Sequence, residues 1–231
     1  MKVSDHLRRA KGTLLSFEIL PPLKGRDIRS IYEGIDPLME FKPSFINVTY
    51  HREEVIYREM GQGLLRKIRV RKRPGTVGIC AMIKAKYEVD TVPHLICGGF
   101  SREDTEDALI ELNFLGIDNV LALRGDPPGG AAEWTKTEGG LEYSSELVGL
   151  IRSDYDFAVA AACFPETHIH ATSPEDDLRH LKEKVDAGAS FLITQLFFDN
   201  AAYFDFVARA RAIGIDVPII PGVLPITNIA Q

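Results

Sequence analysis

Short apolar runs and segments with helical periodicity alternate along the whole chain. An apolar run bounded by Gly, Pro, Asn or Asp is typical of a buried β-strand, and apolar residues three and four apart are typical of an amphipathic helix. The pattern predicts strands at Thr13–Leu20, Ser44–Thr49, Thr91–Cys97, Asn119–Leu123, Phe157–Cys163, Phe191–Phe197 and Val217–Pro221. It predicts helices at Ile28–Phe41, Pro74–Tyr87, Arg102–Leu115, Ser144–Ser153, Pro174–Ala187 and Ala201–Ile213.

Two of the predicted helices carry end signals. Ser101, with Asp104 three residues later, approximates a capping box, and Gly116 follows the last turn of that helix. Ser173 precedes a proline and three acidic residues, and Gly188 ends that helix.

The segment from Pro74 to Ile83 is ambiguous. Its Val and Ile content favours a strand, but Ile79 and Ile83, four apart after a proline, favour a helix. We interpret the basic run Arg66–Arg73 before it as a solvated helix end or loop, with phosphate binding as the alternative.

Seven predicted strands alternating with six predicted helices, without a linker or repeat, predict an α/β fold, a (β/α)8 barrel of the TIM type. We interpret residues 1–231 as a single barrel domain. The count is one unit short, because the chain stops at Gln231, where a seventh helix should begin. We therefore expect a C-terminally truncated barrel, in which strands one and seven keep unpaired edges.

Composition excludes several classes of protein. A net charge of −6 argues against a nucleic-acid surface, and the chain has no apolar run long enough to span a membrane. The first residues lack the apolar core of a secretory signal. Cys80, Cys97 and Cys163 are odd in number and far apart, as expected for buried thiols in a reducing cytoplasm.

Polar residues gather where the predicted strands end. The most informative example is Asn119–Leu123, an apolar run that stops at Arg124-Gly125-Asp126 and is followed by two prolines. In α/β barrels, the chemistry lies at the carboxyl ends of the strands, so polar groups at six of seven ends predict a site at the barrel mouth. The other five groups are Glu18, Thr49-Tyr50-His51, His94, Glu166-Thr167-His168-Ile169-His170 and Thr194-Gln195.

Motifs in order along the chain carry a resemblance to a known family. They are Ser16-Phe17-Glu18 with Pro21-Pro22, Val48-Thr49-Tyr50, Pro93-His94-Leu95, Ala122–Asp126, Lys184–Ala189, Thr194-Gln195 with Phe197–Asp199, and Pro221-Gly222 with Leu224-Pro225. Together they closely resemble methylenetetrahydrofolate reductase, the flavin-dependent barrel enzyme of one-carbon metabolism. The resemblance covers essentially the whole chain.

The resemblance implies an oxidoreductase that binds FAD without a Rossmann fingerprint. The implied activity is reduction of 5,10-methylenetetrahydrofolate to 5-methyltetrahydrofolate with NAD(P)H, by two successive hydride transfers through the flavin, in a cytoplasmic homo-oligomer that serves methionine biosynthesis. It implies flavin contacts at Thr49, Tyr50, His94, Arg124, Gly125, Asp126, Ser144, Phe164, His168, Ala171, Asp177, His180 and Lys184. The sequence does not distinguish NADH from NADPH.

The resemblance also implies the catalytic residues. Glu18 is the expected acid that protonates the departing folate nitrogen, and Asp126 is expected against the flavin and pterin. Gln195 and Gln231 are expected to contact the folate. Three positions depart from the family pattern: Phe164 replaces a tyrosine, His180 an asparagine and Glu183 an arginine. The last departure puts one adenine-side or phosphate contact in doubt.

Two alternatives stay open. Asp126, His94, His168 and His170 have the side chains of a metal-dependent barrel hydrolase. His94, within an apolar strand, is also compatible with a core histidine. The other alternative is a truncated barrel that binds flavin but cannot turn over.

Overall fold

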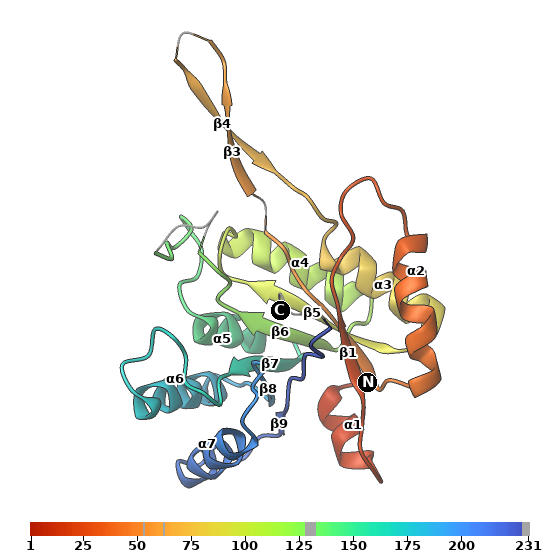
Figure 1. Ribbon diagram of the computed structural model, residues 1–231, viewed down its shortest axis with the longest axis vertical. Helices are drawn as coiled ribbons and strands as arrows, with labels where there is room; N and C mark the ends of the chain where they lie inside the picture. Colours follow the sequence, from red (N-terminus) through yellow and green to blue (C-terminus); the bar gives the residue numbers. More distant parts are fainter. Residues whose placement is uncertain (53, 62, 128–132, 228–231) are drawn as a thin grey trace.

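The core of the protein is a parallel sheet that curls around its own interior (Figure 1). In this computed structural model, residues 1–52, 54–61, 63–127 and 133–227 are described. The sheet contains β1 (Ser16–Ile19), β2 (Phe45–Val48), β5 (Asp90–Ile96), β6 (Asn119–Leu123), β7 (Ala158–Cys163), β8 (Phe191–Thr194) and β9 (Ile219–Ile220), in that spatial order. Every neighbouring pair is parallel. This is an α/β fold of the TIM-barrel type, as predicted, with β1 and β9 at its edges within the described residues.

Helices connect successive strands of the sheet. They are α2 (Arg29–Ile35) with the 3₁₀ helix η1 (Asp36–Phe41), α3 (Thr76–Tyr87), α4 (Arg102–Phe114), α5 (Ser144–Asp154), α6 (Pro174–Asp186) and α7 (Asn200–Ala212). The predicted caps are confirmed: Ser101 Oγ accepts from Asp104 N (3.1 Å), and Ser173 Oγ accepts from Asp176 N (3.1 Å). None of the helices among the described residues is long and apolar enough to cross a membrane.

Two apolar cores result from the period-two alternation of the strands. On β7, Val159, Ala161 and Cys163 pack toward the helices, whereas Ala158 and Ala160 face the interior of the curled sheet. The interior core also contains Val3. This residue belongs to α1 (Val3–Arg9), a helix that the hydrophobic pattern did not predict.

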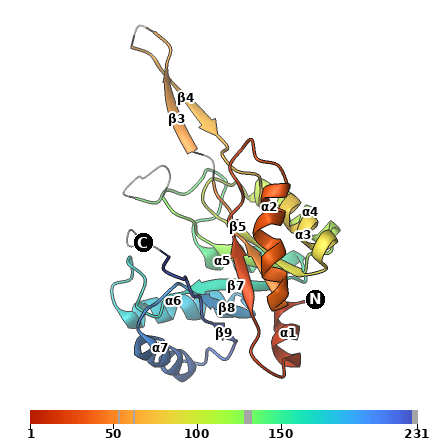
Figure 2. The same ribbon diagram turned by 45° about the vertical axis from the view of Figure 1, so that its right-hand side comes forward.

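A second unpredicted element is an antiparallel hairpin between β2 and α3. Its strands are β3 (Glu54–Glu59) and β4 (Leu65–Val70), and we call it the arm. Figures 1 and 2 show that it projects clear of the rest of the molecule. The interpretation of Arg66–Arg73 as a helix end or loop is therefore wrong, because most of that run is strand. Gly61 and Gly63, with φ of 91° and 71°, supply the turn conformations that L-residues rarely adopt.

Most predicted elements are confirmed, and the errors lie mainly at their ends. The ambiguous segment is the helix α3, which begins at Thr76. The predicted helix Ile28–Phe41 is split, because η1 has Pro37 in its first turn and tightens to 3₁₀ geometry. The predicted strand Phe191–Phe197 ends at Thr194, and Val217–Pro221 contains only the two-residue strand β9.

Candidate functional site

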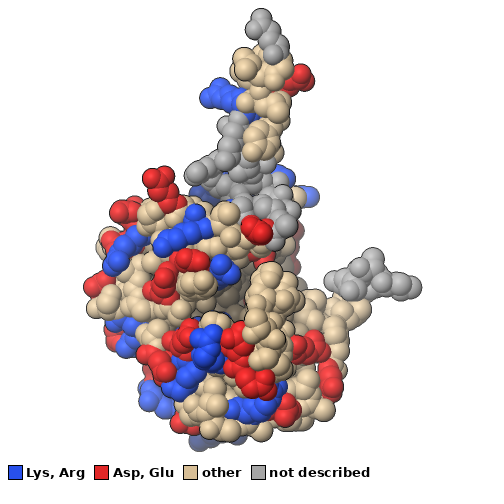
Figure 3. Space-filling model, turned by 90° about the vertical axis from the view of Figure 1, so that its left-hand side faces the viewer, with Lys and Arg blue, Asp and Glu red and all other residues tan. Residues whose placement is uncertain are grey.

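The carboxyl ends of the parallel strands meet on one side of the sheet. Figure 3 shows this side, where a hollow lies among intermixed Lys/Arg and Asp/Glu side chains. The polar residues predicted from the strand ends surround this end of the sheet, which we call the mouth. Parallel pairing produces this arrangement, because it places the last residue of every strand at the same edge.

On β1, β2 and β5 the mouth holds a small cluster of partly desolvated groups. Thr49 Oγ1 donates to Glu18 Oε1 (3.2 Å), and His94 Nε2 lies 3.5 Å from Glu18 Oε2. Partial burial raises the pKa of the Glu18 carboxyl, and the hydrogen bond from Thr49 opposes part of that rise. Glu18 is therefore easier to protonate near neutral pH than an ordinary glutamate.

His94 is buried and electrically neutral. Burial lowers its pKa to about 4, with a smaller contribution from the nearby imidazole of His51. Its Nε2 makes no hydrogen bond within the described part of the chain, and Asn47 Oδ1 on the neighbouring strand β2 is likewise buried and unpaired there. Buried polar atoms without partners are costly and rare in folded proteins. Trp134 Nε1, beside Arg124, is a third such atom, and three of them near the mouth indicate that a bound molecule completes the site.

The Arg124-Gly125-Asp126 corner follows β6. Gly125 has a φ of 82°, and a Cβ built on it would lie 3.2 Å from the Cβ of Ile96, so a larger residue would be strained and crowded here. Arg52, at the root of the arm, donates from Nη1 to the Asp126 carbonyl oxygen (2.8 Å). This hydrogen bond joins the segment before the arm to the loop that follows β6.

Arg124 points from this corner toward the segment before α5. Its Nε donates to the Glu142 carbonyl oxygen (3.1 Å), and its guanidinium carbon lies 4.3 Å from the ring centroid of Trp134 and 5.1 Å from that of Tyr143. Cation–π contacts of this kind hold a guanidinium in a fixed orientation. Ser144, the first residue of α5, is buried beside this group.

The loop after β7 and helix α6 hold a second group of polar residues. Asp177 Oδ2 accepts from His168 N (3.0 Å), the ring of Phe164 packs edge-on against that of His168, and Ala171 N donates to the His168 carbonyl oxygen (2.9 Å). Lys184 Nζ donates to the Ala162 carbonyl oxygen on β7 (3.0 Å). Burial lowers the pKa of both His168 and Lys184, opposed by the charge of Asp177. Asp177 and Lys184 are therefore close enough for their charges to interact, and that they serve one site stays a prediction.

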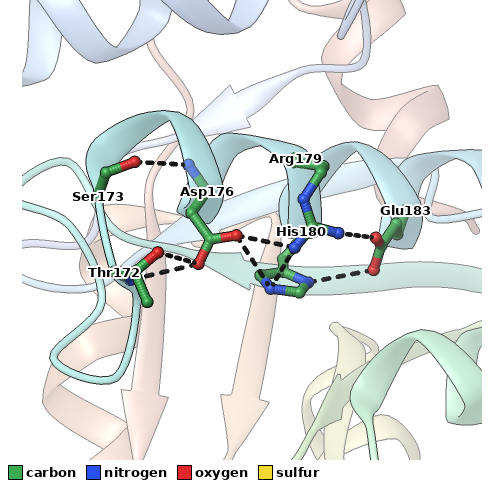
Figure 4. A network of polar contacts seen from close by, with 6 residues as sticks. All are labelled: Thr172, Ser173, Asp176, Arg179, His180 and Glu183. Atoms are coloured by element: carbon green, nitrogen blue, oxygen red, sulfur yellow. Dashed lines mark hydrogen bonds and ion pairs between the residues drawn. The ribbon is translucent and has the colours of Figure 1, made fainter.

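The exposed face of α6 carries a separate polar network (Figure 4). Arg179 bridges Asp176 (2.7 Å) and Glu183 (2.6 Å), and His180 Nδ1 lies 3.2 Å from Glu183 Oε2. The hydrogen bond from Arg179 is the main cause that lowers the pKa of Asp176 to about 2. Two of the three departures from the family pattern, His180 and Glu183, therefore contact each other.

The remaining predicted residues are more dispersed. The Tyr50 ring packs edge-on against Phe100 (5.1 Å). Gln195 is exposed just beyond β8, and its backbone N–H donates to the Cys163 carbonyl oxygen (2.8 Å). Gln231 lies outside the described residues. Sequence reasoning included Asn47 in the end of its strand but gave it no role, and it missed Arg52, which lies only three residues after the predicted Thr49.

Two hollows border helix α3, one of them shared with α4 and the other with α2. The larger, about 500 Å³, is lined partly by Ile28, Ile31, Val77 and Met82. A smaller one of about 150 Å³ shares Arg71 and Gly75 with it and reaches Tyr50. Neither contains the Glu18 cluster. We assign the site to the mouth, because Glu18, His94 and Lys184, whose pKa values burial shifts, and the unpaired His94 Nε2 and Asn47 Oδ1 lie there.

The donor set fits a large anionic cofactor better than a metal. Arg124, His168 and Lys184 supply cationic or N–H groups suited to a pyrophosphate, and Asp177 can accept from ribose hydroxyls. Across residues 1–52, 54–61, 63–127 and 133–227, no group of three His, Cys, Asp or Glu side chains is placed to hold a metal ion. The described residues thus give the metal-hydrolase alternative no ligand set.

Comparisons with known proteins agree with the motif resemblance. The methylenetetrahydrofolate reductase family matches residues 2–231. The 5,10-methylenetetrahydrofolate reductase of Escherichia coli is 36% identical over 230 residues, covering 99% of this chain and 70% of the relative. Methylenetetrahydrofolate reductase 2 of Saccharomyces cerevisiae is 34% identical over 100% of this chain. Methylenetetrahydrofolate reductase (NADH) 1 of Arabidopsis thaliana is 36% identical over 99% of this chain. The chain spans only 37% and 38% of those two proteins.

Solved structures confirm the fold. An uncharacterized protein from Clostridium thermocellum that binds two copies of 5-methyl-5,6,7,8-tetrahydrofolic acid superposes with a TM-score of 0.57 at 16% identity, over 94% of this chain and 67% of that one. A phosphoenolpyruvate phosphomutase from Streptomyces platensis superposes with a TM-score of 0.60 at 14% identity, over 94% and 71%. Such low identities bear on the fold alone. On the evidence of the family match and of the relatives about 35% identical, the chain belongs to the methylenetetrahydrofolate reductase family.

Proposed function

We propose that the protein reduces 5,10-methylenetetrahydrofolate to 5-methyltetrahydrofolate, using FAD bound at the mouth and NAD(P)H as the electron donor. The observation that carries the proposal is the cluster of Glu18, Thr49 and His94, in which a carboxyl group of raised pKa lies beside a buried, neutral imidazole. Family membership supports the substrate. We also propose that residues 1–231 act as one catalytic barrel domain.

The residues that would hold FAD come from the carboxyl ends of β2, β5, β6 and β7 and from helices α5 and α6. Arg124, His168 and Lys184 would meet the pyrophosphate, Asp177 would accept from a ribose hydroxyl, and Thr49, Tyr50, His94, Gly125, Ser144, Phe164, Ala171 and His180 complete the proposed contacts. Glycine at position 125 preserves the shape of this corner, because a Cβ there would crowd Ile96 and strain a backbone with a φ of 82°. When bound, FAD supplies a two-electron carrier that accepts a hydride from the nicotinamide and donates one to the folate.

Glu18 would supply the proton that the second half-reaction needs. The methylene bridge of the folate opens when the departing nitrogen takes a proton, and the resulting iminium carbon then accepts a hydride. A carboxyl group can deliver that proton near neutral pH if burial keeps its pKa high. Neutral His94 adds no positive charge that would favour the ionised carboxylate, and Thr49 orients Oε1 by its hydrogen bond.

The pterin would be held by residues that follow β6 and β8. Asp126 can accept from the pterin N–H donors, and Gln195 offers both a donor and an acceptor at the end of β8. Gln231 is proposed as a further folate contact. Arg52 would fix the Asp126 loop through the hydrogen bond to its carbonyl oxygen.

The test separates the two half-reactions. Glu18→Gln keeps the shape of the side chain but cannot donate an acidic proton. We expect it to purify with FAD and to be reduced by NADH or NADPH at nearly the wild-type rate, while folate reduction falls by about 10²-fold or more. Stopped-flow flavin absorbance measures each step, and Glu33→Gln, an exposed carboxyl on α2, serves as the control.

A comparable loss in both half-reactions would show that Glu18 has a structural role only. Purified protein that is colourless and binds no added FAD would overturn the cofactor assignment itself.

A further inference from the structure

The arm carries exposed apolar side chains that the described part of the molecule leaves uncovered. Leu64 and Leu65 at its tip are each 65% exposed, and Ile56, Tyr57 and Met60 are also exposed. An isolated two-stranded hairpin is only marginally stable in water unless another surface packs against it. Figures 1 and 2 show no part of the body beside the tip.

The arm also holds two cations directly opposite each other. Arg58 on β3 pairs in register with Arg66 on β4, so both guanidinium groups project from the same face of the hairpin. Like charges directly opposite in an antiparallel pair are destabilising. Neither arginine has an ion-pair partner among the described residues, although the chain as a whole carries a net charge of −6. This arrangement favours an acidic partner.

Helix α4 presents a surface of the complementary kind. Glu103, Asp107, Ile110, Glu111 and Phe114 follow the i, i+4, i+7, i+8, i+11 spacing of one helix face, and all five are exposed. Phe114 is 87% exposed. The three acids have no ion-pair partner in the part of the chain that the structure describes.

The spacing of the charges on the two surfaces is compatible. Successive acids four residues apart on a helix are separated by about 6 Å along its axis. Side chains directly opposite in an antiparallel pair are about 5 Å apart at Cβ. Two carboxylates of α4 can therefore face the two guanidinium groups of one arm, with apolar residues of both surfaces beside them. The tip of the arm stands clear of its own α4, so the contact has to be made between molecules.

We propose that the arm of one molecule docks on helix α4 of a second copy of this chain. Reciprocal exchange in a two-fold dimer would form the contact twice, once for each arm, and would cover both apolar surfaces. The contact is independent of the chemistry proposed for the mouth.

The first experiment is a charge swap read out by sedimentation velocity. We expect the wild-type protein to sediment above the 25.7 kDa of a single chain and to dissociate as salt screens the ion pairs. Arg58→Glu with Arg66→Glu should weaken self-association at least tenfold, and so should Asp107→Lys with Glu111→Lys. Combining all four substitutions should restore it. The double variant Arg9→Glu/Lys11→Glu makes the same change of charge on another exposed segment and should have no effect.

A second measurement locates the contact. In Arg66→Lys, a zero-length carbodiimide should join residue 66 of one copy to residue 107 or 111 of another, as shown by mass spectrometry of the cross-linked dimer. Circular dichroism of each variant checks that it is folded.

Three results would overturn the proposal. They are a wild-type protein that is monomeric at every concentration, an oligomer that both reversed pairs leave intact, and an oligomer lost in the arm variant but not in the α4 variant. The last would mean that the arm docks elsewhere.

Discussion

The two ends of the sheet differ in how far their buried polar groups are hydrogen-bonded within the chain. At the amino-terminal end, α1 closes the interior, and Asn119 is fully paired: its Oδ1 accepts from Val3 N (2.7 Å) and its Nδ2 donates to the Met1 carbonyl oxygen (3.1 Å). His6 Nε2 lies 2.7 Å from Asp90 Oδ2 at the same end. Thr91, the second residue of β5, is the exception at this end: within the described part of the chain, its buried Oγ1 interacts only with the Cys80 thiol. At the carboxyl-terminal end, His94 Nε2, Asn47 Oδ1 and Trp134 Nε1 are buried and make no hydrogen bond among the described residues.

This difference distinguishes polar groups that are paired within the chain from polar groups that a bound ligand would pair. A buried hydrogen bond made within the chain contributes to stability whether or not a ligand is present. A buried polar atom left unpaired costs stability, and it is retained where a bound molecule completes it. Substitutions at the amino-terminal end should therefore change stability, and those at the mouth should mainly change binding, chemistry or pH dependence.

The largest expected effect is on stability against pH, and it comes from His94. Its folded pKa of about 4 lies below the ordinary 6.5, so between these values the unfolded chain takes up a proton that the folded protein does not. Stability should therefore fall as the pH falls from 6.5 to 4, by about 3 kcal/mol at about 1.4 kcal/mol per pKa unit.

His94→Gln should remove this part of the pH dependence, as measured by urea unfolding at a series of pH values. An unchanged slope in His94→Gln would contradict the assignment of a buried, neutral imidazole.

The next effect concerns the paired end. Asn119→Ala removes both hydrogen bonds and leaves the Val3 N–H buried without an acceptor, so we expect a loss of about 2 kcal/mol in the free energy of unfolding. The FAD affinity of the folded protein should not change. Urea unfolding and a flavin titration measure the two quantities, and weakened FAD binding in this variant would break the distinction between the two ends.

The same comparison explains which features could be predicted from the sequence. Parallel strands such as Asn119–Leu123 form continuous apolar runs, because both of their faces are buried, and these were found. Helix α1 was missed because it is short and buries only Val3 and part of Leu7, so it shows no periodic apolar stripe. The arm was missed because successive described residues of β3, such as Ile56 and Tyr57, are both exposed and give no alternation. The Val, Ile and Tyr content flanking Gly61 and Gly63 is nevertheless a hairpin signal.

The candidate site was predictable to a similar extent. Strand ends identified Glu18, His94 and Arg124, because parallel topology alone places them at one edge. Contacts that depend on how loops fold back, such as Arg52 on the Asp126 carbonyl oxygen or Trp134 on Arg124, leave no local pattern in the sequence.

A smaller effect is expected for Lys184 at the mouth. Lys184→Met keeps the length of the side chain but removes the cation proposed to meet the FAD pyrophosphate, so FAD should bind about tenfold more weakly, as expected for loss of one charge-assisted hydrogen bond. Lys182→Met, on the same helix but paired with Asp186, is the matched control and should bind FAD normally. Equal losses in both variants would point to an effect on helix α6 as a whole.

The smallest effect should come from the exposed face of α6. Glu183→Arg removes the acceptor of Arg179 and the neighbour of His180, and exposed pairs of this kind contribute about 0.5 kcal/mol or less. It also restores the arginine that the family resemblance leads us to expect at this position. If this face borders the adenine side of FAD, the added cation should tighten FAD binding a few-fold, in a manner that salt suppresses. The control Glu183→Gln removes the carboxylate without adding a cation, so its FAD affinity shows the effect of losing the carboxylate alone. Tighter binding in Glu183→Arg alone would place this face against the cofactor, whereas equal affinity in all three proteins would confine FAD binding to the groups around Arg124, His168 and Lys184.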